Sequence, residues 1–349
     1  MAFSEVPNES KSQIDKAGRM LLGGNIGTDQ LKEAKDLVER WRACHAYPIN
    51  TFQATLRNKV KKFSGKPIVA QRLKRMPTIV DKLQRYPDMK LTRMQDIGGV
   101  RAVLDSIEDV NRLAAEYREE SRFNHTLKQE KDYISNPRNQ DGYRSVHLTY
   151  KYKNEFAPSY DDLLLELQIR TKLQHIWATA VETTGTLINQ ALKSRQGDKD
   201  WIDFFAVTSS AFAHMEDSPL VPRYKDYTYR QTCGMVAELN GKLGVLDKIK
   251  GYSIAAKVIG DSKRNRRWLY FLITLDLSER RAQIRPYTEA EFSDAAMDYA
   301  KFEEQAEKGK KVSSVLVSAG PISVLRQAYP NFFLDINDFI NKVEEIIHA

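Results

Sequence analysis

The sequence has few cysteines and no long apolar run. Only two of its 349 residues are cysteine, Cys44 and Cys233, which are too few and too distant for a disulfide framework or a zinc cage. No run of about 18 apolar residues occurs, and the N-terminus MAFSEVPNESKS lacks the apolar core of a signal peptide. A phosphate-binding loop of the form GxxxxGK[ST] is also absent. These absences predict a cytoplasmic protein with no membrane partner, in which side-chain cations would have to hold any phosphate.

Positive charge is in modest excess. The chain has 54 Lys and Arg against 46 Asp and Glu, a net charge of +8, which indicates an anionic partner such as nucleic acid or a nucleotide. A hydrophobic content of 42% and a charged content of 29% are ordinary for a globular protein with a buried core. The length predicts two domains.

One cationic run stands out near the N-terminal third. Residues 57–75 contain eight Lys or Arg and no Asp or Glu. Such a run is either a solvated face or a surface that contacts nucleic-acid phosphates. Its candidate nucleic-acid-binding members are Arg57, Lys59, Lys61, Lys62 and Lys66.

Hydrophobic periodicity divides the chain into two parts. Residues 8–63 have helical spacing, and between 72 and 192 predicted strands at 97–104 and 163–170 alternate with predicted helices at 107–122 and 171–192. This alternation is typical of an α/β or α+β domain. We expect a first domain at 1–215, a linker at 216–232 and a smaller α+β domain at 233–349. The smaller domain is predicted to contain strands at 252–260, 268–277 and 313–319 and helices at 289–308, 321–329 and 335–347.

The stretch NPRNQDGYRSVHLTYKY (136–152) combines a turn with an alternating strand. Gly142 after Asp141 favours a tight turn. Beyond it, Ser145, His147 and Thr149 fall on one face of a strand. The pattern indicates either a half-buried strand with one wet side or the floor of a site.

Two carboxylates provide a possible metal site. Glu166 shares a strand face with Gln168 and Arg170, and Asp96 begins another strand. Two converging carboxylates can bind Mg²⁺ together with water, although Glu166 could instead be ion-paired with Arg170. The cations that could surround them are Arg72, Lys74, Arg101, Lys131, Arg138 and Arg170.

Four segments carry a family resemblance: QRLKRMPTIVDKL, QDIGGVRAVL, EKDYISNPRNQDGYRSVHLTYKY and LELQIRTKLQHIWATAVE. In this order they resemble the synthetase domain of the RelA/SpoT family over about residues 50–215. The resemblance implies an α+β, nucleotidyltransferase-like fold with a mixed sheet flanked by helices. It also implies a pyrophosphokinase that transfers pyrophosphate from ATP to a ribose 3′-hydroxyl with Mg²⁺. No His-Asp dipeptide occurs, whereas the hydrolase half of bifunctional family members carries one, so we expect synthesis without hydrolysis.

The resemblance also implies roles for single residues. Arg72 and Lys74 match an ATP-binding pair, Asp96 matches a Mg²⁺ ligand with Arg101 behind it, and Lys131 and Arg138 would grip phosphates. Tyr143 matches the residue that stacks on the acceptor base, and His147 would face the same cleft. Glu166, beside Gln168, matches the carboxylate that binds metal or activates the attacking hydroxyl.

Two acceptor classes are plausible, and we expect the tRNA 3′ CCA end, with GDP or GTP as the alternative. A small alarmone synthetase would use GDP or GTP, whereas a toxic relative would use the 3′-terminal adenosine of tRNA and inhibit translation. The segments WRACHAYPINTF and AYPNFFLDINDF resemble CapRel-type fused toxin–antitoxin proteins, which implies phage defence with restraint by the C-terminal domain and a phage protein, such as a capsid protein, as trigger. A non-catalytic nucleic-acid binder is a third reading, but it would be expected to have lost Asp96 or Glu166.

The segment AYPNFF offers candidate regulatory residues. Tyr329 and Phe332 flank a Pro-Asn bend, and Tyr329 could fill an adenine slot against Arg72 by cation–π attraction. The alternative is that both aromatic residues belong to the core of the small domain.

Overall fold

The structure is a computed structural model that describes residues 3–23, 27–63, 65–119, 124–191, 198–261, 267–276, 281–308, 310, 312–318 and 332–349. Its contacts divide the chain into two units. The first unit comprises Met1–Ser135 and Arg144–Lys172, and the second comprises Asn136–Tyr143 and Leu173–Ala349. The chain therefore crosses between the units three times.

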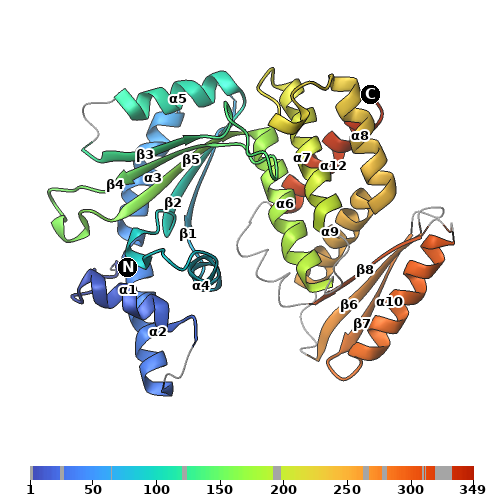
Figure 1. The fold of residues 1–349 in the computed structure, drawn as a ribbon, viewed down its shortest axis with the longest axis horizontal. Helices are drawn as coiled ribbons and strands as arrows, with labels where there is room; N and C mark the ends of the chain where they lie inside the picture. The colour runs from blue at the N-terminus through green and yellow to red at the C-terminus, as the bar shows by residue number, and fades with distance from the viewer. Residues whose placement is uncertain are drawn as a thin grey trace. The chain divides into compact units, whose positions relative to one another are not determined.

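The first unit is built on a mixed five-stranded sheet in the order β1-β2-β5-β4-β3 (Figure 1). Strands β2 and β5 are parallel, and the other neighbouring pairs are antiparallel. The α+β class predicted from the sequence is therefore confirmed. The elements are α1 (Lys11–Met20), α2 (Thr28–Ala43), α3 (Ala46–Val60), β1 (Ile68–Leu73), α4 (Met76–Arg85), η1 (Leu91–Arg93), β2 (Gly98–Leu104), α5 (Ile107–Glu119), β3 (Thr126–Asp132), β4 (Val146–Lys151), η2 (Pro158–Tyr160) and β5 (Leu164–Thr171).

One face of this sheet is apolar and packs against α3 and α5 (Figure 1). Leu148 and Leu167 are fully buried there, beside Phe52 of α3. Gly98 allows the close approach of α3, because a Cβ at this position would lie 3.0 Å from the side chain of Ile49. Burial of this face fixes the strand register, so the polar residues of the same strands face the other side.

The second unit joins a helical bundle to a small antiparallel sheet in the order β7-β6-β8 (Figure 1). Helix α10 packs on the sheet through Phe302 and Ala295. The elements are α6 (Lys172–Ala191), α7 (Asp198–Met215), η3 (Pro222–Tyr224), α8 (Tyr229–Leu243), α9 (Val245–Asp261), β6 (Trp268–Asp276), β7 (Arg281–Thr288), α10 (Phe292–Glu307), β8 (Val312–Ser318) and α12 (Phe332–Ile347).

The C-terminal helix α12 is part of the bundle core. Phe339 is fully buried, with ring centroids 6.0 Å from Phe205 and 6.1 Å from Phe212, both on α7. The buried pair His175 and Asp335, 3.3 Å apart, links α6 to α12. The structure therefore places α6 and α7 in one unit with 216–349, whereas the sequence analysis set its boundary at 215.

One predicted strand is wrong. Residues 252–260 lie within helix α9, which follows the left-handed Gly244 (φ 60°). Val245 and Ile249 are buried one helical turn apart, so the periodicity of the whole segment is helical. The predicted strands at 268–277 and 313–319 and helices at 289–308 and 335–347 are confirmed as β6, β8, α10 and α12 within a few residues, while the predicted helix 321–329 lies outside the described residues.

None of the helices in the described part of the chain combines the length and apolar character needed to cross a bilayer.

Candidate active site

The polar face of the first unit's sheet carries two rows of residues that cross all five strands. Paired residues of neighbouring strands point to the same face. The pairing of β4 with β5 therefore brings His147 and Thr149 to the same face as Glu166 and Gln168. In strand order β1-β2-β5-β4-β3, one row is Ala70, Arg101, Gln168, His147 and Lys131, and the next is Arg72, Gly99, Glu166, Thr149 and Gln129.

Glu166 is held through both carboxylate oxygens. His147 Nδ1 lies 2.9 Å from Oε1, and Gln168 Nε2 donates to Oε2 at 2.7 Å. Arg101 Nε donates to Gln168 Oε1 at 3.2 Å, which fixes the orientation of the amide. Burial works to raise the pKa of Glu166, but the hydrogen bond and charge of His147 outweigh it, and the pKa lies below its usual value. The side chain is therefore an ionised and oriented carboxylate.

Asp96 is a second half-buried carboxylate and is held by two lysines. Lys74 Nζ donates to Oδ2 at 2.7 Å, and Lys82 Nζ donates to Oδ1 at 2.9 Å. Burial opposes ionisation of Asp96, but the two ammonium groups lower its pKa to about 2. Burial lowers the pKa of Lys74, which is only 5% exposed, against the attraction of Asp96. The charge of Asp96 also acts on Glu166, whose pKa it works to raise, so the two carboxylates are electrostatically coupled.

Gly99 lies between Arg72 and Glu166 in the second row. A Cβ at Gly99 would lie 3.1 Å from the backbone oxygen of Glu166 and 4.0 Å from Arg72 Cγ. The packing around Gly99 is therefore close, and a larger residue there would displace its neighbours.

Two residues that contact this site were not predicted from the sequence. Lys82 of α4 is a partner of Asp96, and Tyr133 contacts the ring of His147 edge-on at 5.4 Å. Lys82 lies within the quoted segment QRLKRMPTIVDKL, eight residues after Lys74, and Tyr133 lies within EKDYISNPRNQDGYRSVHLTYKY. Neither segment shows which residue its side chain contacts.

Arg170 is buried, as is Lys74, whereas other predicted phosphate ligands are exposed. It lies on the same strand face as Glu166 and Gln168, but it is only 3% exposed. Arg72 and Lys131 are exposed in the same region of the unit. A buried guanidinium is a poorer ligand for a phosphate arriving from solvent than these two cations.

Arg138 and Tyr143 belong to the second unit. The Arg138 guanidinium forms a 2.5 Å ion pair with Asp141 and lies 4.7 Å from the centre of the Tyr143 ring. Tyr143 is half-buried, and its ring centroid lies 6.4 Å from that of Trp177. The sequence analysis expected a more exposed platform; the structure packs Tyr143 against the bundle core.

The cationic run is partly neutralised within the first unit. Lys59 and Lys62 approach Glu116 at 4.0 and 2.5 Å, and Lys59 also lies over the Tyr117 ring. Lys61 donates to the Asn58 side chain. Arg57, Lys61 and Lys66 are exposed, so only part of the run presents its charge to solvent.

Of the two predicted regulatory residues, Tyr329 lies outside the described residues, and Phe332 is the first residue of helix α12.

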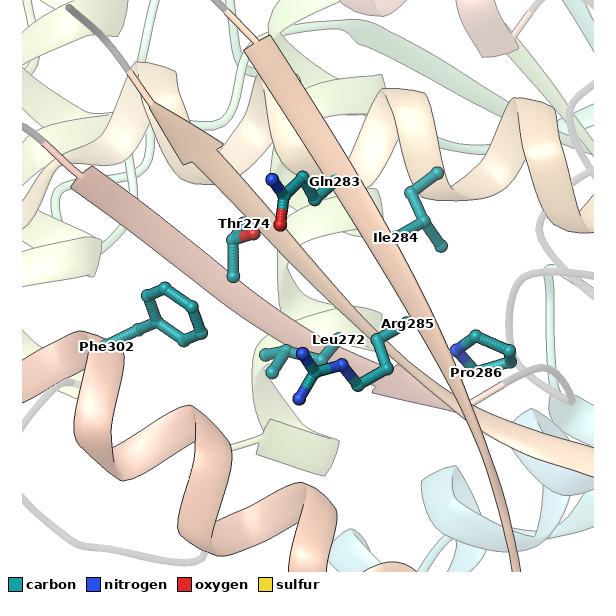
Figure 2. A pocket seen from close by; sticks show the side chains of 7 residues that line it. All are labelled: Leu272, Thr274, Gln283, Ile284, Arg285, Pro286 and Phe302. Atoms are coloured by element: carbon teal, nitrogen blue, oxygen red, sulfur yellow. The ribbon is translucent and has the colours of Figure 1, made fainter.

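A small hollow of about 150 Å³ lies elsewhere, in the second unit. Figure 2 shows it between β6, β7 and α10, with Leu272 and Phe302 as its apolar lining. Arg285, which also lines it, is ion-paired with Asp298 at 2.7 Å. Across the described residues, no group of three or more His, Cys, Asp or Glu could hold a metal ion.

Comparison with known proteins places the candidate site in a recognised region. Residues 71–185 match the family model described as "Region found in RelA / SpoT proteins", which is about a third of the chain. This segment contains both carboxylates and every predicted nucleotide ligand.

A curated relative matches the same part of the chain. The GTP pyrophosphokinase YjbM of Bacillus subtilis (strain 168) is 31% identical over 113 residues, 32% of this chain and 52% of the relative. The chain thus spans about half the length of this relative.

Solved structures of similar proteins include small alarmone synthetase 1 from Bacillus subtilis, with a TM-score of 0.44, 22% identity and coverage of 52% of this chain and 93% of that one. A GTP pyrophosphokinase family protein from Streptococcus pneumoniae has a TM-score of 0.42, 22% identity and coverage of 50% and 86%.

Proposed function

We propose that the chain is a pyrophosphokinase that transfers the β,γ-pyrophosphoryl group of ATP to a ribose 3′-hydroxyl. The observation that carries this proposal is the pair of coupled carboxylates, Asp96 held by lysines and Glu166 held by His147 and Gln168, within the RelA/SpoT-like segment. The acceptor oxygen attacks the β-phosphorus, the bond from the β-phosphorus to the α,β-bridging oxygen breaks, and AMP leaves.

Side-chain cations bind the triphosphate in this proposal. Arg72 is exposed on the edge strand β1, and Lys74 and Lys82 lie at Asp96. Arg101 contributes a further positive charge in the neighbouring row. Lys131 and, from the second unit, Arg138 are proposed to contact the phosphates as well. Positive charge placed before the reaction stabilises the charge that develops on the transferred group.

Mg²⁺ fits the chemistry of the donor set. Asp96 and Glu166 provide the hard carboxylate oxygens that Mg²⁺ prefers, and both are ionised at neutral pH. When bound, Mg²⁺ would neutralise charge on the triphosphate. Lys74 and Lys82 hold the Asp96 carboxylate in place, while Gln168 and His147 do the same for Glu166.

Glu166 acts by orientation more than by basicity. Its pKa lies below the usual value, so it is always ionised near neutrality but is a weak proton acceptor. It accepts a hydrogen bond from the attacking 3′-hydroxyl and aligns it. The hydroxyl proton passes to this carboxylate or to water as the bond to phosphorus forms.

The acceptor class we favour is a guanosine nucleotide, which is supported by the similarity to a protein named GTP pyrophosphokinase. Tyr143 would stack on its base. A tRNA 3′ end is the second candidate and is supported by the exposed Arg57, Lys61 and Lys66. Lys59 and Lys62 give it less support, because both approach Glu116.

The second candidate also includes a role as a fused toxin–antitoxin in phage defence, with a capsid or other phage protein as trigger. The 164 residues after the matched segment, 186–349, could supply the restraint. Truncation before Tyr329 is an unsuitable test, because it also removes α12 and its buried Phe339. Tyr329→Ala in the full chain is the cleaner variant, and release of restraint would appear as higher transfer to tRNA.

One assay tests the proposal. The full chain is incubated with γ-labelled ATP, Mg²⁺ and either GDP or deacylated tRNA, and the labelled product is identified. We expect label on GDP and its loss with Glu166→Gln by at least a hundredfold. Glu130→Gln is the matched control, because Glu130 pairs with Arg118 outside the two rows. Label on tRNA alone would favour the second candidate, and label on neither acceptor would refute the proposed activity.

A further inference from the structure

The loop Asn136–Tyr143 connects two strands of the first unit but packs within the second. It follows β3 through Tyr133–Ser135 and leads directly into Arg144 and β4. The loop is therefore continuous in the chain with β3 and β4, while its conformation is set by contacts with the helical bundle.

The first anchor is a close contact between Gly142 and α7. Ser209 Oγ donates to the Gly142 carbonyl oxygen at 2.6 Å, and both residues are buried. Gly142 has a φ of +79°, and a Cβ there would lie 2.9 Å from Ala206 Cα. Both the backbone conformation and the contact with helix backbone therefore require glycine.

The second anchor is Arg223 of η3. Its backbone N–H donates to Asn139 Oδ1 at 3.0 Å, and its guanidinium donates to the Gln140 carbonyl oxygen at 3.2 Å. Asp203 of α7 forms a 2.5 Å ion pair with the same guanidinium, which orients it toward the loop. Arg223 thus connects the loop to η3 through its backbone N–H and to Asp203 of α7 through its guanidinium.

The anchored loop carries Arg138 and Tyr143. Gly142 N donates to the Arg138 carbonyl oxygen at 2.9 Å, and Arg138 N donates to the Tyr143 carbonyl oxygen at 3.3 Å. These backbone bonds close the loop into a turn that keeps the guanidinium over the Tyr143 ring. Movement of Asn139, Gln140 or Gly142 would therefore move both residues.

We propose that Ser209 and Arg223 are positioning residues for the acceptor, because they fix loop 136–143 in the conformation that presents Arg138 and Tyr143. This inference rests on the proposed function. Neither residue contacts substrate in the proposal. Both lie outside the RelA/SpoT-like segment 71–185, so the helical bundle determines acceptor affinity through a loop of that segment. Residues proposed to bind ATP on β1, β2 and α4 do not depend on these anchors.

The test uses Arg223→Ala in the full chain, with Lys242→Ala as the matched control. Lys242 forms a 2.7 Å surface ion pair with Asp200 in the same bundle and is not an anchor of the loop. For Arg223→Ala we expect the KM for GDP, or for tRNA if that takes the label, to rise about tenfold, comparable to loss of one charge-assisted hydrogen bond. The KM for ATP should rise less than the KM for the acceptor, because Arg138 is the one residue of the anchored loop proposed to contact the triphosphate, and kcat should stay within twofold. Arg223→Lys keeps a cation for Asp203 and should recover part of the loss.

Hydrogen exchange without substrate provides a readout that does not depend on activity. Peptides containing 136–143 should exchange faster in Arg223→Ala and Ser209→Ala than in the unaltered protein or in Lys242→Ala. Equal exchange in all four proteins would refute the anchoring. Faster exchange with an unchanged acceptor KM would refute the positioning role. Absence of transfer by the unaltered protein would refute the proposed function instead, and acceptor positioning with it, while exchange would still decide whether the loop is anchored.

Discussion

Replacement of Asp96 by Asn tests how much the ion pairs of Asp96 with Lys74 and Lys82 stabilise the first unit. Asp96 accepts from Lys74 and Lys82, and its side chain is only 19% exposed. The lysines lower its pKa from 3.8 to about 2. Since one pKa unit corresponds to about 1.4 kcal/mol, ionised Asp96 contributes roughly 2 kcal/mol to the free energy of unfolding.

The pH dependence has a definite sign. Because the pKa is lower in the folded than in the unfolded protein, this contribution is fully present above about pH 4 and is lost as the pH falls toward 2. Asp96→Asn removes the contribution and leaves Lys74, 5% exposed, without its counter-charge. Lys74 can respond by losing its proton, because burial already lowers its pKa. We therefore expect a loss of about 2–3 kcal/mol at pH 7, below the upper range for a broken buried pair.

Stability of the first unit can be measured by urea unfolding followed with deuterium pulses on peptides from β2 and β5. Asp81→Asn is the matched control, because Asp81 forms an exposed 2.6 Å pair with Arg85 on α4 that should contribute no more than about 0.5 kcal/mol. Asp96→Asn combined with Lys74→Met should recover part of the stability. Equal stability of the Asp96 and Asp81 variants at pH 7, with the same acid dependence, would show that the lysine cluster does not stabilise the unit.

Two further variants test the residues proposed to bind the acceptor. Tyr143→Ala should weaken GDP binding about ten- to a hundredfold, the range of one lost base–aromatic stack, and leave ATP binding unchanged in a titration; equal weakening of ATP would place Tyr143 on the donor side. Reversal of Arg57 and Lys61 to Glu should leave transfer to GDP intact. If tRNA is an acceptor, the same reversal should reduce that transfer and flatten its salt dependence, since fewer counterions are released; an unchanged salt slope would identify the run as a solvated surface.

Alternation along single strands could be predicted from the sequence, because a residue's face depends only on its position in its own strand. His147 and Glu166 were placed on polar faces in this way, and the pairing of β4 with β5 brings them to 2.9 Å. The partnership of Lys82 with Asp96 depends on how α4 packs against the residues before β2. No local pattern contains that information.

The boundary between the two units could not be predicted from local patterns either. It depends on contacts between distant residues, such as Phe205 with Phe339, whereas the sequence analysis placed the linker by its prolines and mixed charge. The strand expected at 252–260 failed for a related reason. That window is short and apolar, and its helical period becomes visible only when it is extended back to Val245.

The loop shared between the units constrains which parts of this chain could be exchanged with another protein. A recombination breakpoint anywhere between residues 143 and 206 would separate Gly142 from Ser209, its hydrogen-bond donor, and from Ala206, which leaves no room for a larger residue at position 142. A chimera made from the matched segment alone would end within α6 and carry the loop without its support. The exchangeable part is therefore discontinuous in sequence, and a graft into a related protein has to include the α7 and η3 surfaces together with residues 136–143.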